Sequence, residues 1–91
     1  ALPAQWYQGL GAWRKADYAK ASQHFVAAST QKKLAGSHRA AAHFWAARAY
    51  SKMGKHREAR DMLRAASEQT HTLYGMLAGK ILGQSLNIIA A

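Results

Sequence analysis

The sequence contains no cysteine, a single proline and only four acidic residues. Without cysteine, the chain can form neither a disulfide bond nor a thiolate metal site. It has no run of about 18 uncharged apolar residues, so the sequence offers no candidate transmembrane helix. No stretch of alternating polar and apolar residues is long enough to predict a β-strand. These absences indicate an all-α protein, and 91 residues suffice for one domain at most.

The few carboxylates give little basis for catalysis. We expect Asp17 to cap a helix, and Glu58 and Asp61 to form surface ion pairs with arginines at the i, i+3 and i+4 spacings. A general acid needs a carboxyl group in an apolar cleft, and no apolar stretch surrounds these residues or Glu68. No two of the five histidines have the i, i+4 spacing of a helical metal site. We therefore expect no catalytic residue, no metal site and no bound cofactor.

Residues 42–63 predict two helices joined at Gly54. The first helix carries one apolar stripe, made of Ala42, Trp45, Ala46, Ala49, Tyr50 and Met53. Glycine takes positive φ without a steric penalty, so Gly54 is expected to end this helix. The next apolar series has the i, i+3, i+4 and i+7 spacing and comprises Ala59, Met62, Leu63 and Ala66. A loop this short predicts an antiparallel pair of helices.

The same pattern occurs about 38 residues earlier, a spacing typical of helical-hairpin repeats. Small residues recur where helices approach closely, and aromatic residues recur where gaps between helices must be filled. The corresponding pairs are Tyr7/Trp45, Gly9/Ala47, Ala12/Tyr50, Ala16/Gly54, Tyr18/His56, Ala21/Ala59, Phe25/Leu63 and Ala28/Ala66. We therefore expect antiparallel hairpins stacked as a tetratricopeptide-like (TPR-like) solenoid of about five helices.

One TPR-like helical repeat domain is expected over residues 1–84. Its hairpins span about 3–30 and about 38–69, and its last helix spans about 73–82. Ser37 is expected to be the N-cap of the helix that begins at about 38. Residues 85–91 are apolar and are interpreted as a linker to a further domain. The chain opens Ala-Leu-Pro without an initiator methionine or a signal peptide, which suggests a piece of a longer or processed protein.

The helix over about 73–82 is expected to carry an interface. It is apolar nearly all round, with Lys80 as its only charge, and it follows Thr72 as the expected N-cap. Too little other chain remains to cover it, so we expect the missing domain or a second copy of the chain to pack there. The candidate interface comprises Leu73, Tyr74, Gly75, Leu77, Gly79, Ile81 and Leu82. Gly75, Gly79 and Gly83 lie four apart, which would let another backbone approach.

Thirteen Lys and Arg residues against four Asp and Glu give a net charge of +9, which favours an anionic partner. The candidate face for such a partner comprises Lys52, Lys55, Arg57, Arg60 and Arg64. A solvated outer helix face explains this cluster more simply. Nucleic-acid binding would need a recognition helix or exposed aromatic side chains. Most aromatic residues fall on the core stripes, and the exception, Phe44, is expected to pack against an adjacent helix.

Three strings go beyond generic repeats. Residues 44–49 read Phe-Trp-Ala-Ala-Arg-Ala, residues 72–78 read Thr-Leu-Tyr-Gly-Met-Leu-Ala, and residues 9–18 read Gly-Leu-Gly-Ala-Trp-Arg-Lys-Ala-Asp-Tyr. Together they resemble the helical region that precedes the catalytic domain of soluble lytic transglycosylases, the periplasmic enzymes that cleave peptidoglycan. The resemblance covers almost the whole chain. This chain has Leu73 where the family pattern has phenylalanine, and it lacks a proline often found just upstream.

The resemblance implies a non-catalytic periplasmic scaffold that packs against a lysozyme-like domain and accommodates glycan strands of peptidoglycan. The intact parent would cleave the MurNAc–GlcNAc bond and leave an anhydro end. No catalytic residue transfers, because the family's glutamate lies in a Glu-Ser pair, whereas Glu58 precedes alanine and Glu68 precedes glutamine. The alternatives are a stand-alone TPR-like protein–protein interaction module and, less favoured, a basic nucleic-acid-binding helical domain.

Overall fold

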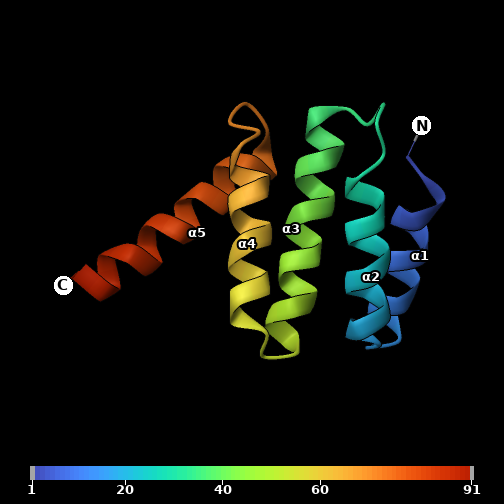
Figure 1. Ribbon diagram of the computed structural model, residues 1–91, viewed down its shortest axis with the longest axis horizontal. Helices are drawn as coiled ribbons and strands as arrows, with labels where there is room; N and C mark the ends of the chain where they lie inside the picture. The colour runs from blue at the N-terminus through green and yellow to red at the C-terminus, as the bar shows by residue number, and fades with distance from the viewer. Residues whose placement is uncertain (1, 91) are drawn as a thin grey trace.

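Five α-helices make up the computed structural model, which describes residues 2–90, with side chains described for residues 2–84. They are α1 (Ala4–Arg14), α2 (Tyr18–Ser29), α3 (Gly36–Lys52), α4 (His56–Ser67) and α5 (Leu73–Ala90). Each helix packs against the next one in the chain, and α3 also contacts α5. Figure 1 shows α1 to α4 side by side in a row, with α5 running obliquely away from α4. The expected all-α fold of stacked antiparallel hairpins is therefore confirmed, with no strand over residues 2–90.

The two hairpin turns have the same backbone geometry at corresponding positions of the repeats. Ala16 has a φ of 59° and Gly54 a φ of 73°. The residue after each turn donates its backbone N–H to a carbonyl in the preceding helix, Asp17 to Ala12 and Lys55 to Tyr50, at 2.9 Å in both cases. Such bonds are typical of a helix that ends at a residue in the left-handed (αL) conformation. The repeat seen in the sequence is thus a repeat of the fold.

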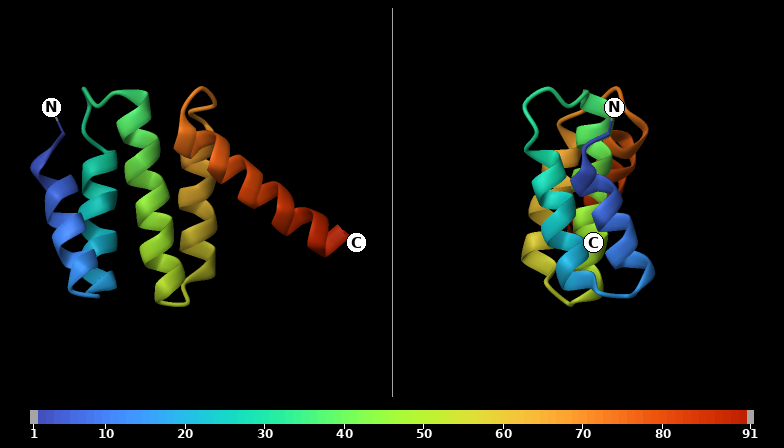
Figure 2. Two further views of the ribbon diagram at one scale, coloured as in Figure 1. Left: turned by 180° about the vertical axis from the view of Figure 1, so that it is seen from behind. Right: turned by 90° about the vertical axis from the view of Figure 1, so that its right-hand side faces the viewer.

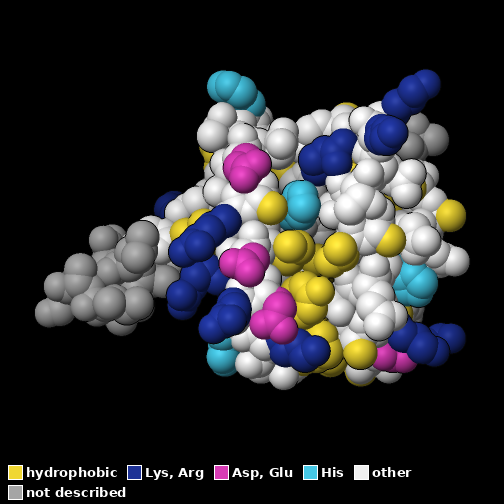
Figure 3. All heavy atoms as spheres, in the orientation of Figure 1, with side chains coloured by type: hydrophobic (Ala, Val, Ile, Leu, Met, Phe, Trp, Pro, Cys, Tyr) yellow, Lys and Arg dark blue, Asp and Glu magenta, His cyan; other side chains and the backbone are white. Residues whose placement is uncertain are grey.

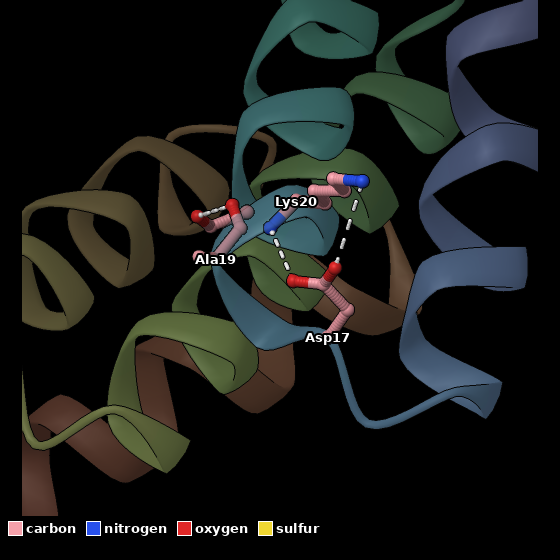
Figure 4. A network of polar contacts seen from close by, with 4 residues as sticks. Asp17, Ala19 and Lys20 are labelled. Carbon is pink, nitrogen blue, oxygen red and sulfur yellow. Dashed lines mark hydrogen bonds and ion pairs between the residues drawn. The ribbon is translucent and has the colours of Figure 1, made fainter.

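Two of the three expected N-caps are present. The Asp17 carboxylate accepts a hydrogen bond from the backbone N–H of Lys20 at 3.2 Å (Figure 4). Thr72 accepts one from the backbone N–H of Gly75 at 3.0 Å. The prediction for Ser37 was wrong, because α3 begins at Gly36 with no side-chain cap.

The start of α3 depends on contacts with other segments instead of a cap. The end of the Gln69 side chain lies close to Gly36, 2.6 Å from where a Cβ atom would be, so a larger residue there would only displace that side chain. Arg39, one turn further on, donates hydrogen bonds to three carbonyls at the end of α2 and in the following loop: Ser29, Gln31 at 2.8 Å and Leu34 at 3.4 Å. A cation at a helix C-terminus also interacts favourably with the helix dipole. These contacts fix the longest irregular stretch of the chain onto α3.

An aromatic core joins the first hairpin to α3. Phe25 is completely buried, and the Trp6 ring meets it edge-on with centroids 5.4 Å apart. Trp13 contacts Tyr18 at 5.0 Å and Trp45 at 5.2 Å, both edge to face. Such pairs contribute about 0.5–1.5 kcal/mol beyond the burial of their area. The expected core positions of Tyr18 and Trp45 are confirmed.

The helices approach closely because small residues line their contacts. A Cβ atom on Gly9 would lie 2.7 Å from the ring of Phe25. Alanines buried to within 1% exposure are Ala21, Ala28, Ala40, Ala42, Ala46, Ala49, Ala66 and Ala78. The row is therefore held by aromatic rings in the first hairpin and by alanine contacts throughout.

The last helix is anchored at its start and longer than expected. The rings of Tyr74 on α5 and Phe44 on α3 pack at a tilt of 41° with centroids 5.0 Å apart, which confirms the expected packing of Phe44. A side chain on Gly75 would clash with the Gln69 carbonyl, but Gly83 has nothing within 4 Å, so only part of the glycine strip meets another segment. The helix was expected to end near residue 82 and extends to Ala90, because a single glycine such as Gly83 costs a helix only about 1 kcal/mol.

The expected tail at 85–91 belongs to this helix as far as Ala90, and its side chains and residue 91 lie outside the described residues. Figure 2 shows the same oblique exit of α5 from behind. Across the described part of the chain, no helix combines the length and the apolar character needed to span a bilayer.

Candidate functional site

A groove of about 310 Å³ lies between α3, α4 and the part of α5 that diverges from them. Its apolar lining comes from all three helices and comprises Phe44, Ala47, Ala59, Leu63, Ile81 and Leu82. Its polar lining comes from α3 and α4 and comprises Arg48, Ser51, His56 and Arg60. No carboxylate lines this groove, so an apolar floor is combined with positive charge.

Arg48 is held in place by two aromatic rings, although it is exposed. Its guanidinium carbon lies 4.5 Å from the centroid of the Trp45 ring and 4.9 Å from that of Trp13. Cations at these distances are attracted by the electron-rich ring faces. One cation of the groove is thus positioned by the aromatic core. Sequence reasoning missed this role, although the i, i+3 spacing of Trp45 and Arg48 was a signal for it.

The predicted basic face only partly coincides with the groove. Of its five residues, Arg60 lines the groove, and the other four are exposed at the end of α3, in the turn or on α4: Lys52, Lys55, Arg57 and Arg64. Figure 3 shows Lys and Arg side chains gathered over α4 and toward α5, with acidic side chains among them on α4. Basic side chains therefore predominate around the groove, and Arg60 brings one of these positive charges into its lining.

The expected ion pairs on α4 are not formed. Over residues 2–84, the one ion pair joins Lys20 and Asp17 at 3.9 Å, at the start of α2. Glu58 and Asp61 are exposed, and neither has an arginine within ion-pair distance. Exposed pairs contribute only about 0–1 kcal/mol and immobilise two long side chains, so their absence is physically unsurprising. The arginines of α4 are left available to an external anion.

The candidate interface on α5 divides into three parts. Leu73 is 64% exposed, Leu77 37% and Ile81 39%, and Gly79 is exposed as well. Tyr74 and Gly75 are used within the chain, against Phe44 and the loop before α5, and Leu82 faces the groove. Sequence reasoning left out Met76, which is 59% exposed. Its omission came from weighting the glycines, whereas Met76 lies one turn from Leu73 and continues the same apolar face.

The surroundings of His43 clearly shift the pKa of its imidazole. Its Nδ1 atom is buried and has no hydrogen-bond partner. Burial, aided by the charge of Arg39, lowers the pKa of His43, and Glu68 acts in the opposite direction. A neutral imidazole is therefore favoured in the fold. Within the described residues, no three His, Asp or Glu side chains gather to hold a metal ion.

In comparisons with protein-family models, curated proteins and solved structures, nothing matches this chain.

Proposed function

We propose that this chain is a non-catalytic helical scaffold of a periplasmic peptidoglycan lytic transglycosylase. The observation that carries the proposal is the contact between two of the strings that resemble that family. Phe44 opens the first string and Tyr74 belongs to the second, and their rings pack against each other with centroids 5.0 Å apart. Residues that are far apart in the sequence thus meet in one structural unit.

The other residues of these strings also have defined positions. Thr72 caps α5, and Gly75 allows the Gln69 carbonyl to approach. In the first string, Trp45 packs on Trp13, and Arg48 lies over both rings. A chance match of two amphipathic hairpins would not require the polar and glycine positions to be used in this way. These contacts support the proposal that the resemblance extends from the sequence to the structure.

A scaffold of this kind would use two surfaces. The exposed apolar side chains at the start of α5, Leu73, Met76 and Leu77, would pack against the lysozyme-like catalytic domain of the parent or a second copy of the chain. The net charge of +9 would attract the anionic glycan strands of the cell wall. Catalysis would belong entirely to the parent's catalytic domain.

The reading frame that encodes this chain tests the proposal directly. We expect it to continue into a lysozyme-like segment containing a Glu-Ser pair. The product of the whole frame should release anhydromuropeptides from purified sacculi, detected by mass spectrometry, whereas the 91-residue chain should release none. The matched control is the whole product with the glutamate of that pair changed to glutamine. A frame that ends without such a segment, or release by the chain itself, would refute the scaffold role.

The groove beneath α5 favours a second candidate, a stand-alone TPR-like module that binds a protein partner. Its mixed apolar and cationic lining is of the kind that receives a peptide segment. The two candidates differ in the reading frame, since a module of this kind needs no catalytic segment. A nucleic-acid-binding role is less favoured, because Trp6, Trp13, Trp45 and Phe25 pack on one another in the core.

A further inference from the structure

The groove occupies the place in the second hairpin that the aromatic core occupies in the first. The turns after α1 and α3 show which residues correspond, since Ala16 donates its backbone N–H to the Trp13 carbonyl at 2.9 Å and Gly54 donates to that of Ser51 at 3.0 Å. Three bulky core residues are replaced by smaller residues that line the groove: Trp13 by Ser51, Tyr18 by His56 and Phe25 by Leu63. The second hairpin therefore lacks the rings that fill the first.

The helix that follows each hairpin shows the same loss of volume. Trp45 on α3 packs its ring against Trp13 and Phe25. The loop before α5, residues 68–72, is one residue shorter than the loop before α3, residues 30–35, so the position equivalent to Trp45 falls on Leu82. Leu82 borders the groove. The space left by a second indole is therefore open.

We propose that this groove binds a segment of another protein that inserts a large aromatic side chain flanked by acidic residues. An indole or phenol ring matches the volume lost by exchanging tryptophan, tyrosine and phenylalanine for serine, histidine and leucine. Leu63 and Leu82 supply the apolar floor, and Arg48 and Arg60 supply the charges that pair with carboxylates. This site is independent of the scaffold proposal, because it requires only the 91-residue chain.

Other occupants fit this groove less well. A second copy of the chain carries only four acidic residues and a net charge of +9, so it has no acidic segment to offer. A single-stranded nucleic acid would need an open aromatic face for its bases. In the lining, the ring of Phe44 already packs against that of Tyr74. A glycan strand alone would leave Leu63, Ile81 and Leu82 without an apolar partner.

Calorimetry with short capped peptides tests both halves of the proposal. The probe is acetyl-Glu-Glu-Trp-Glu-Glu-amide, compared with the same peptide carrying alanine for tryptophan and with one carrying lysines for the glutamates. We expect the first peptide to bind and each of the others to bind roughly tenfold more weakly or not at all. Absence of binding by the first peptide, or equal binding by either control peptide, would overturn the proposal.

Filling the groove from within provides the second test. Ser51→Trp and Leu82→Trp restore the rings of the first repeat, so they should raise the melting temperature and weaken peptide binding roughly tenfold or more. Leu73→Trp is the matched control, because it makes the same exchange on the same helix outside the groove, and it should leave binding unchanged. Unchanged binding in both filled variants would overturn the proposal.

Arg60→Glu reverses the charge of the groove lining without filling it, so it tests the site even where a tryptophan variant fails to fold. It should weaken binding of the acidic peptide and strengthen binding of the lysine peptide, and no change in either affinity would count against the site. A single-stranded oligonucleotide is titrated in parallel with each variant. Tight oligonucleotide binding that is lost in the groove-filling variants would overturn the proposal of a protein partner and indicate a nucleic acid instead.

Discussion

The turn after α1 holds an alanine where the equivalent turn after α3 holds glycine, and exchanging these residues should have opposite effects. At a φ of 59°, the Cβ atom of Ala16 is crowded by its own backbone, which costs roughly 1–2 kcal/mol. Ala16 is exposed, so Ala16→Gly removes no buried contact. The extra freedom of glycine in the unfolded chain offsets about 0.4–1 kcal/mol of the gain. We expect Ala16→Gly to raise the free energy of unfolding by about 0.5–1 kcal/mol.

For a domain of this size, that gain corresponds to roughly 2–8 °C in the melting temperature. Gly54→Ala should have the opposite sign and lower stability by about 1 kcal/mol, since its Cβ atom would meet nothing within 4 Å and only the φ of 73° opposes it. Gly11→Ala is the matched control, because Gly11 also has open space but lies inside α1, where alanine gains about 0.5–1 kcal/mol. Thermal and urea unfolding followed by circular dichroism measure all three variants. A loss of stability in Ala16→Gly, or equal effects of Gly54→Ala and Gly11→Ala, would refute the argument from φ.

Three further predictions concern single positions. Lys55 is the N-cap residue of α4, has nearly the backbone geometry of Asp17 and makes no side-chain capping hydrogen bond. Lys55→Asp should therefore raise the free energy of unfolding by about 0.5–1 kcal/mol. Lys52→Asp, which makes the same change of charge at the end of α3, should not. Gly9→Ala should lower the melting temperature, despite the better helix propensity of alanine, because the new methyl group would press on the fully buried Phe25 ring; a rise would show that the core can yield. Burial lowers the pKa of His43 in the folded chain, so below about pH 6.5, the pKa of an unperturbed histidine, the unfolded chain binds more protons than the folded chain. The free energy of unfolding should therefore fall as the pH drops below that value, and His43→Gln should remove this fall in urea titrations at a series of pH values. A His43→Gln variant with the parent's pH dependence would contradict the assignment.

Local patterns in the sequence were sufficient to predict most of the helical framework. Periodic apolar residues gave the existence and order of the helices, and Gly54, Asp17 and Thr72 gave three of the boundaries. These signals work because a helix face and a cap depend on residues within one or two turns. The start of α3 at Gly36 was missed because no capping side chain marks it, and Arg39 binds carbonyls of the preceding segment instead.

The candidate site was harder to predict, because it is defined by what the second repeat lacks. Counting charges placed the basic face near α4, but it gave no reason to distinguish Arg60 from Arg57 or Arg64. The orientation of Arg48 depends on rings from two different helices. The groove itself appears only when α5 is seen to leave the hairpin obliquely, and an angle between helices has no local sequence signal. The length of α5 was underestimated because the low helix propensity of Gly83 suggests a helix end, whereas its cost is too small to end the helix there.

Every helix of this chain packs mainly against its neighbours in sequence, and α3 also contacts α5 and, through the rings of Trp45 and Trp13, α1. Under a stretching force applied to both ends, such a row should come apart from the outside, with α5 detaching before the hairpin to which it is joined. The interlocked rings of Trp13 and Trp45 would make the junction between the first hairpin and α3 the last to yield. The molecule would then behave as a spring with one stiff segment and one compliant end.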